Sequence, residues 1–180
     1  MDTEPKNCAV DEEYCRKVDE YIATDSPVVF GNYSQAHAAC VIQKFLESAK
    51  DSVVILSGDF PGDFYQNGIL EAIKSAAERL KDKKKVRIIT LNGNTDSKLN
   101  ALHQTGLEYR VGRLRDENKP VSHFMVVDDK RYRLEYPHSR INSEISPVKA
   151  EICCNDTERS LLLTSFFSSV WNKLTPVPTR

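Results

Sequence analysis

A histidine and an aspartate occupy suggestive positions in the segment VSHFMVVDDKRYRLE, which runs from Val121 to Glu135. Histidine changes its charge near neutral pH, so His123 could serve as a nucleophile, a proton donor or a ligand for phosphate. Asp128 ends an apolar run and opens the polar turn DKR. The chemical question is whether this segment is a catalytic site or the shell of one.

Two strands are expected to position these side chains. Apolar and alternating residues predict strands from Phe124 to Val127 and from Tyr132 to Glu135, joined by the polar turn. Because strand residues alternate between faces, positions 121 and 123 lie on the same side of the sheet. Ser122 lies beside His123 and is placed in the same candidate site.

This segment resembles the signature of the phospholipase D superfamily, whose active members carry the motif His-x-Lys-x4-Asp. When the sequence is aligned on Asp128, Val121 stands where the family has its nucleophilic histidine, and His123 stands where it has its lysine. A later glutamate of the family corresponds to Glu151, and the resemblance covers roughly residues 32–174. The family also has Gly-Ser-x-Asn after its aspartate, and the matching positions here are Glu135, Tyr136, Pro137 and His138.

The resemblance implies an α/β fold with a mixed, mostly parallel sheet sandwiched between helices, equivalent to a single phospholipase D half. In active members two motifs face each other; one histidine attacks phosphorus and the other protonates the leaving oxygen. Val121 can do neither. The resemblance therefore implies a degenerate active site, in which His123 occupies the former phosphate pocket. Histidine in place of lysine weakens phosphate binding there and could make it depend on pH.

The candidate ligand-binding residues are His123, His138, Glu151 and Ser122, and the vestigial motif is His123 with Asp128. A simpler interpretation makes His123 a hydrogen-bonded structural residue. Asp128 is then a strand-end residue that pairs with a cation. His123, His138 and Glu151 could form one polar cluster, but no tight spacing of metal ligands occurs. No metal and no cofactor are therefore expected.

Basic side chains around the motif are expected to form a solvated surface. Acidic residues are interleaved with them, which favours a solvated face over a dedicated anion interface. The basic set comprises Arg110, Arg113, Arg115, Lys130, Arg131 and Arg133.

Hydrophobic spacing predicts the remaining elements. Helices are expected over residues 11–24, from Ser34, from Ile69, from Thr95 or Asp96 to Gly106, and from Asp156. Further strands are expected at residues 53–56, 86–91, 107–111 and 148–153. The 180 residues suit one domain, with an N-terminal amphipathic arm at 1–31, the phospholipase D-like domain at 32–174 and a C-terminal tail at 175–180.

Bulk composition describes an ordinary globular protein, since the formal net charge is −1 and 40% of the residues are hydrophobic. The five cysteines are odd in number and show no CxxC spacing, so neither a zinc site nor a disulfide framework is indicated, and a reducing compartment is favoured. The acidic start MDTEPKNCAVDEE does not resemble a secretory signal, and no apolar run approaches the roughly 20 residues that span a bilayer. A cytoplasmic location is expected.

Three functions compete. The favoured hypothesis is a catalytically inactive phospholipase D-like module, a pseudoenzyme that binds a ligand or an unknown protein partner as a regulatory or scaffold subunit. The second is a phosphodiesterase or nuclease that uses His123 or His138 in a rearranged site. The third is a membrane-surface module that binds anionic lipid head groups. The ligand would carry phosphate, as in nucleic acid or a lipid head group, and one motif per chain predicts a homodimer.

Overall fold

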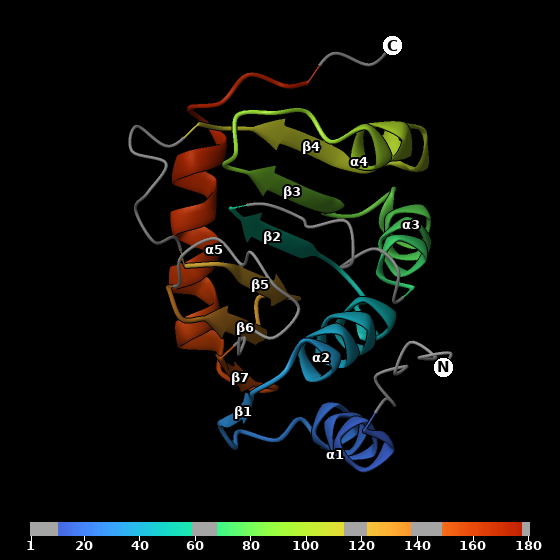
Figure 1. Cartoon of the computed structure of the whole chain (residues 1–180), viewed down its shortest axis with the longest axis vertical. Coiled ribbons are helices and arrows are strands. Elements are labelled where there is room, and N and C mark those ends of the chain that lie inside the picture. Colours follow the sequence, from blue (N-terminus) through green and yellow to red (C-terminus); the bar gives the residue numbers. More distant parts are fainter. Residues whose placement is uncertain (1–10, 59–67, 114–121, 138–148, 178–180) are drawn as a thin grey trace, which may run out of the picture.

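A seven-stranded sheet forms the centre of the molecule (Figure 1). The computed structural model describes residues 11–58, 68–113, 122–137 and 149–177. The strands follow the spatial order β1-β7-β6-β5-β2-β3-β4. Their bounds are Phe30–Asn32 for β1, Val53–Ser57 for β2, Val86–Thr90 for β3, Glu108–Val111 for β4, Phe124–Val127 for β5, Arg131–Glu135 for β6 and Ala150–Cys153 for β7.

The sheet is mixed, which confirms the expected fold class. Strands β2, β3 and β4 are parallel neighbours, whereas the other four pairings are antiparallel. The expectation of a mostly parallel sheet therefore holds for strand direction, because β1, β2, β3, β4 and β6 point one way and only β5 and β7 point the other. It does not hold for neighbour pairing. The turn between β5 and β6 is too short for the crossover that parallel neighbours need.

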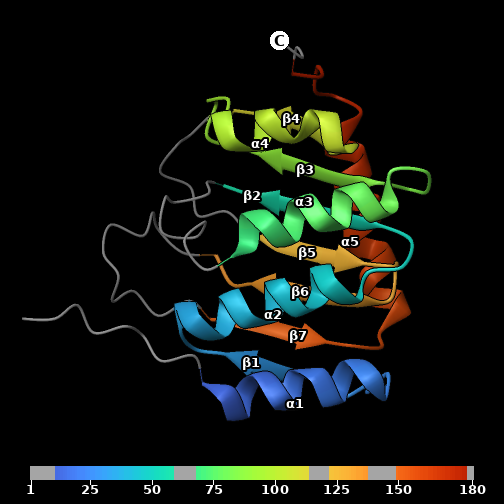
Figure 2. The ribbon, with the colours of Figure 1, turned by 90° about the vertical axis from the view of Figure 1, so that its right-hand side faces the viewer.

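Helices cover the two faces of the sheet unequally (Figure 2). One face carries α1 (Glu12–Ala23), α2 (Gln35–Ser48), α3 (Ile69–Leu80), α4 (Ser97–Ala101) and the 3-10 helix η2 (Leu102–Thr105), and the other face carries α5 (Thr157–Trp171). All the predicted helices are confirmed, and Asp96 caps α4 as one of the two expected candidates. In the described residues, no helix is long and apolar enough to span a membrane.

Strand alternation divides the core into two layers. In β2, Val53 and Ile55 pack beneath the helices α1 to α4, whereas Val54 and Leu56 pack against α5. Phe167 of α5 is fully buried in the second layer. Because both faces are covered, a polar side chain on any central strand is buried and needs a partner.

The last helix is fastened to the outer strand β4 by Arg110. Its guanidinium donates hydrogen bonds to the carbonyl oxygens of Trp171 (2.6 Å) and Leu174 (2.8 Å). The same group lies 4.3 Å from the centre of the Trp171 ring. A cation suits the negative C-terminal end of a helix and the face of an aromatic ring. Arg110 thus has a structural partner, unlike the solvated side chain that the sequence predicted.

A disulfide joins Cys15 of α1 to Cys40 of α2. The expectation that the cysteines would form no disulfide is therefore wrong for this pair. The two residues are 25 positions apart and become neighbours only because the two helices pack side by side, which their sequence spacing does not indicate. Cys153 and Cys154 are free and buried, and they pack on opposite faces of the sheet.

Cys154 should resist thiol reagents in the folded protein. Burial raises the pKa of its thiol from 9.0 to about 12. Because only the thiolate reacts, its modification at about pH 8 should be about 1,000-fold slower than in the unfolded chain. The stabilising contribution of this thiol is present below pH 9 and is lost as the pH rises towards 12, since the folded pKa exceeds the unfolded one. Timed alkylation followed by peptide mass spectrometry measures the rate, and labelling as fast as in urea would contradict the prediction.

Candidate functional site

Polar side chains from four strands form one row across the sheet. Asn32 of β1 is in register with Ala150 of β7, which is in register with Glu135 of β6. The amide of Glu135 donates to the carbonyl oxygen of His123 (2.8 Å), so His123 continues the row at the start of β5. Leu56 pairs with Phe124, which places Ser57 of β2 next to His123. The row lies at the end of the sheet where β2 and β6 finish.

His123 is held between Ser57 and Glu135. The Ser57 Oγ lies 3.3 Å from the His123 Nδ1, and the Glu135 Oε1 lies 3.8 Å from the same nitrogen. Gly58 leaves room for the other side of the ring, because a Cβ atom at this position would lie 3.0 Å from the His123 Nε2. The side chain of His123 remains 21% exposed, so a small ligand can reach the imidazole.

Glu135 is neutralised by Arg133, which lies on the same face of β6. The Arg133 Nη2 donates to the Glu135 Oε2 (2.7 Å), and its Nε donates to the Asn32 Oδ1 (3.0 Å). Both charged side chains are more than nine-tenths buried. Ala150 lies between β1 and β6 in the row, and its small side chain leaves space for Asn32 and Arg133 to meet. The buried pair sums to zero charge, so the net charge of this group depends on whether His123 is protonated.

The arrangement does not match a catalytic triad. In a triad the nucleophile and the acid contact opposite nitrogens of the imidazole, so that one nitrogen accepts the proton while the other is oriented. Here Ser57 and Glu135 both approach Nδ1 of His123. Activation of Ser57 by a histidine that the acid orients is therefore not built into this geometry. Across the part of the chain that the structure describes, no three His, Cys, Asp or Glu side chains gather to hold a metal.

Asp128 lies at the far end of β5 from His123 and has a structural role. Its carboxylate accepts hydrogen bonds from the backbone amides of Lys50, Asp51 and Ser52, at 2.7 to 3.2 Å. The Arg131 guanidinium lies 3.6 Å from the same carboxylate. The interpretation of Asp128 as a strand-end residue paired with a cation is confirmed. It ties the turn after β5 to the loop before β2.

The structure does not bring the other candidate residues to His123. Glu151 lies on the opposite face of the sheet, where it is in register with Leu134 and its Oε1 accepts a hydrogen bond from the Tyr132 hydroxyl (2.5 Å). The expected cluster of His123 with Glu151 is therefore not formed. Alternation along β7 explains this, because Glu151 and its neighbour Ile152 must point to opposite sides. Ser122 is half-buried just before β5. Val121 and His138 lie outside the described residues.

Four residues of the site were missed by sequence reasoning. Ser57 and Asn32 carry no motif, and Glu135 was considered only as a departure from the family pattern. Arg133 was assigned to a solvated basic surface, which is wrong because only 4% of it is exposed. Arg131, of the same assignment, is also buried, with 7% exposed. The alternating order Arg-Tyr-Arg-Leu-Glu in β6 was the available signal, because it places the charged residues of this strand together on one face.

Comparison with known proteins defines the fold. No family model matches the chain, and no curated protein matches it. Solved structures do. Nuc of Salmonella typhimurium, a phospholipase D family member, superposes with a TM-score of 0.65 at 17% identity, over 83% of this chain and 97% of Nuc. NucT of Helicobacter pylori gives a TM-score of 0.59 at 19% identity, over 83% of this chain and 100% of NucT.

A third match is TrmBL2, an archaeal chromatin protein described with a novel mode of DNA binding. Its TM-score is 0.57 at 16% identity, over 92% of this chain and 61% of TrmBL2. At these identities the similarity concerns the fold alone. The chain therefore has a phospholipase D-like fold, which confirms the resemblance that the segment ending in Asp128 indicated.

Proposed function

We propose that this chain is a phospholipase D-like binding module that holds a phosphate group beside His123 and does not cleave phosphodiesters. The observation that carries the proposal is the position of His123. It stands where the family motif has its phosphate-binding lysine, it is partly exposed, and it is held by Ser57 and by the neutralised Glu135. The hydroxyl of Ser57 adds a hydrogen-bond donor for a phosphate oxygen.

The charge of the site supports binding that depends on pH. Arg133 and Glu135 cancel each other, so a neutral His123 leaves the group without net charge. Protonation of His123 adds one positive charge beside a partly exposed surface, and charge-assisted hydrogen bonds to phosphate are roughly twice as strong as neutral ones. A proton on His123 also pairs favourably with Glu135, whose Oε1 lies 3.8 Å from Nδ1. Binding should therefore strengthen as the pH falls through the range in which histidine ordinarily titrates.

The absence of catalysis is supported by the residue at the nucleophile position. Val121 has no atom that can attack phosphorus or protonate a leaving oxygen. The alternative is a phosphodiesterase or nuclease that uses His123 or His138 in a rearranged site. His138 lies outside the described residues, and the contacts of Ser57 and Glu135 with a single ring nitrogen do not form a relay for His123. We therefore place His123 in binding and not in nucleophilic chemistry.

Titration with short oligothymidylate tests the proposal, because phosphodiesters keep one charge over the relevant pH range. We expect the affinity to be at least about tenfold higher at about pH 5.5 than at about pH 8, since a hydrogen bond to a charged group contributes 1.5–3 kcal/mol. The oligonucleotide should remain intact. His123→Lys should bind equally at both pH values, and His123→Ala should bind weakly at both. Cleavage that disappears in His123→Ala would establish the enzyme alternative instead.

A parallel measurement distinguishes the two sources of such a phosphate, nucleic acid and lipid. Nucleic acid is the ligand class we propose, and the fold shared with the chromatin protein TrmBL2 is compatible with it. The lipid alternative is favoured by one observation, since Leu161, Leu162 and Phe166 of α5 are exposed apolar residues. Sedimentation with anionic vesicles at low and moderate salt measures this binding. Vesicle binding without oligonucleotide binding would favour the membrane-surface module.

We further propose that the chain forms a homodimer with its two-fold axis near His123. In active members of the phospholipase D family two motif-bearing halves face each other, and the fold described for this chain corresponds to one such half. Light scattering at micromolar concentration should give a mass near twice the 20.4 kDa of the chain. A monomer under these conditions would overturn the homodimer, and an unknown protein partner would then be the remaining way to cover the motif.

A further inference from the structure

We propose that α1 is a redox-controlled clamp on the candidate phosphate site. In this proposal the Cys15–Cys40 disulfide holds Tyr14 against β1, and β1 positions Arg133 through Asn32. The inference rests on the proposed function where it concerns phosphate affinity. The connection between α1 and the residues of β6 stands on contacts alone.

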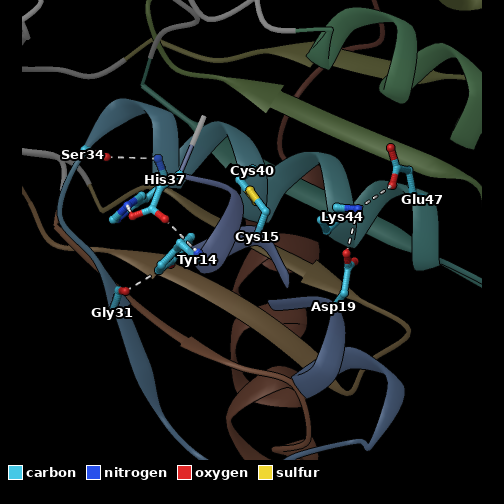
Figure 3. Close-up of a disulfide and its surroundings, with 10 residues drawn as sticks. Tyr14, Cys15, Asp19, Gly31, Ser34, His37, Cys40, Lys44 and Glu47 are labelled. Atoms are coloured by element: carbon cyan, nitrogen blue, oxygen red, sulfur yellow. Dashed lines mark hydrogen bonds and ion pairs between the residues drawn. A yellow bond between two sulfur atoms is a disulfide. The ribbon is translucent and has the colours of Figure 1, made fainter. Parts of the chain in front are cut away.

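The disulfide is the covalent fastening of α1 to α2. Val18 is the one fully buried residue of this helix, and Tyr14, Tyr21 and Ile22 pack against the same core while remaining partly exposed. The ion pair between Lys44 and Asp19 (2.9 Å) is partly exposed and contributes little. Figure 3 shows the bridge between Cys15 and Cys40 at the centre of these contacts, with the ion pair on one side and Tyr14 on the other.

Tyr14 transmits the position of α1 to β1. Its ring stacks on His37 of α2, with 3.9 Å between ring centroids, and its hydroxyl donates to the carbonyl oxygen of Gly31 (3.1 Å), as Figure 3 shows. Burial raises the pKa of Tyr14, and the positive charge of Arg133 opposes this rise. Tyr14 is adjacent to Cys15 in the chain and moves with it.

The contacts from β1 to His123 are continuous. Asn32 follows Gly31 and is fully buried, and its side-chain oxygen accepts from Arg133. Arg133 donates to Glu135, which lies beside His123. Tyr14 and Asn32 are thus positioning residues, because they act on the site through Arg133 without reaching the ligand. A shift of Arg133 away from Glu135 weakens their 2.7 Å ion pair, so that more of the negative charge of this carboxylate acts on the bound phosphate and repels it.

A cellular dithiol can open the clamp. Its thiolate attacks the Cys15 sulfur, which is half-buried whereas Cys40 is buried, and forms a mixed disulfide as the bond between the cysteines breaks. The second thiol of the reductant then releases Cys15. The protein gains two electrons and two protons and carries two thiols, while the reductant becomes a disulfide. In the cytoplasm that the sequence predicts, bridges are commonly transient and redox-sensing, which fits this use.

The first measurement is the redox state and its effect without ligand. Air-oxidised protein, unfolded and titrated, should show two fewer free thiols than the fully reduced protein, whose five cysteines are all free. Reduction should then speed amide hydrogen exchange in α1, in β1 and at residues 131–135 of β6. Five free thiols, or exchange at residues 131–135 that is unaffected by reduction, would overturn the clamp.

The second measurement is the affinity for oligothymidylate at about pH 5.5. Reduction should weaken binding about fivefold, because pre-organisation of the site is lost. Cys15→Ser should bind with the affinity of the reduced protein, and adding reductant should not change this affinity. Cys154→Ser should lose affinity on reduction as the unmodified chain does. Tyr14→Phe keeps the bridge but removes the hydroxyl, so it should weaken binding in the oxidised form. Equal binding by oxidised and reduced protein would contradict the clamp.

The two proposals can fail separately. If neither redox form binds oligothymidylate, the proposed function fails, and the exchange rates at residues 131–135 alone decide on the clamp. If both forms bind and Tyr14→Phe binds as tightly as the unmodified chain, the phosphate site is supported and the proposed clamp is contradicted.

Discussion

Replacing Arg133 by methionine should lower the free energy of unfolding by about 3–5 kcal/mol, which is the cost of removing one partner from a buried ion pair. The arginine is 4% exposed and holds Glu135 at 2.7 Å and Asn32 at 3.0 Å. Methionine fills similar space but removes the ion pair with the buried Glu135 carboxylate and the hydrogen bond to the Asn32 Oδ1. Urea denaturation followed by circular dichroism measures the loss.

Two further variants separate the effect of the buried charge on the free energy of unfolding from the effect of lost packing. The double change Arg133→Met with Glu135→Gln removes both charges and should recover a substantial part of the loss. The exposed pair of Lys85 and Glu108 (2.9 Å) provides a matched control, because Lys85→Met should cost less than about 1 kcal/mol. If Arg133→Met costs no more than this control, Arg133 and Glu135 do not behave as a buried ion pair.

Asp128→Ala should lower the free energy of unfolding by about 3–4 kcal/mol, because three backbone amides lose a charged acceptor and each such bond contributes about 1.5–3 kcal/mol before water replaces part of it. The amides belong to Lys50, Asp51 and Ser52. Asp128 also has a φ of 55°, in the left-handed region that alanine adopts less readily than aspartate. Thermal and urea unfolding measure the change.

Asp128→Asn is the matched control for this second prediction. Asparagine keeps the shape, one acceptor oxygen and the tolerance for left-handed backbone, so about half of the loss should be avoided. Since Asp128 lies at the far end of β5 from His123, neither variant should change the affinity of folded protein for oligothymidylate. Selective loss of binding with unchanged stability would instead place Asp128 in the site.

Much of the fold followed from patterns along the chain. The apolar stripe of α2 and the apolar runs of β2 and β3 predicted these elements clearly. A helix that is buried on one side repeats its apolar residues with the helical period, and a strand covered on both faces is apolar along its length. Strand β1 was missed. It has three residues, Phe-Gly-Asn, too few for any period, and it is a strand only because β7 pairs with it.

The site was less predictable than the fold for a physical reason. The motif located His123 because its partners in the family pattern are close in sequence. The residues that contact it come from β2 and β6, and Asn32 reaches the group from β1, so they meet only after the sheet is assembled. Glu151 illustrates the converse, since the alignment placed it near His123 and the alternation of β7 turned it to the other face.

The contact between Asn32 and Arg133 joins residues 101 positions apart in the chain. Closing a loop of this length costs conformational entropy, which is offset only after further contacts have formed. Such pairings should therefore form late in folding. During refolding, helix formation and the local hairpin of β5 and β6 should therefore precede the pairing of β1 with β7 that brings Asn32 into place. The proposed phosphate site should therefore be completed late in folding, and a fragment that begins after Asn32 should lack the contact that positions Arg133.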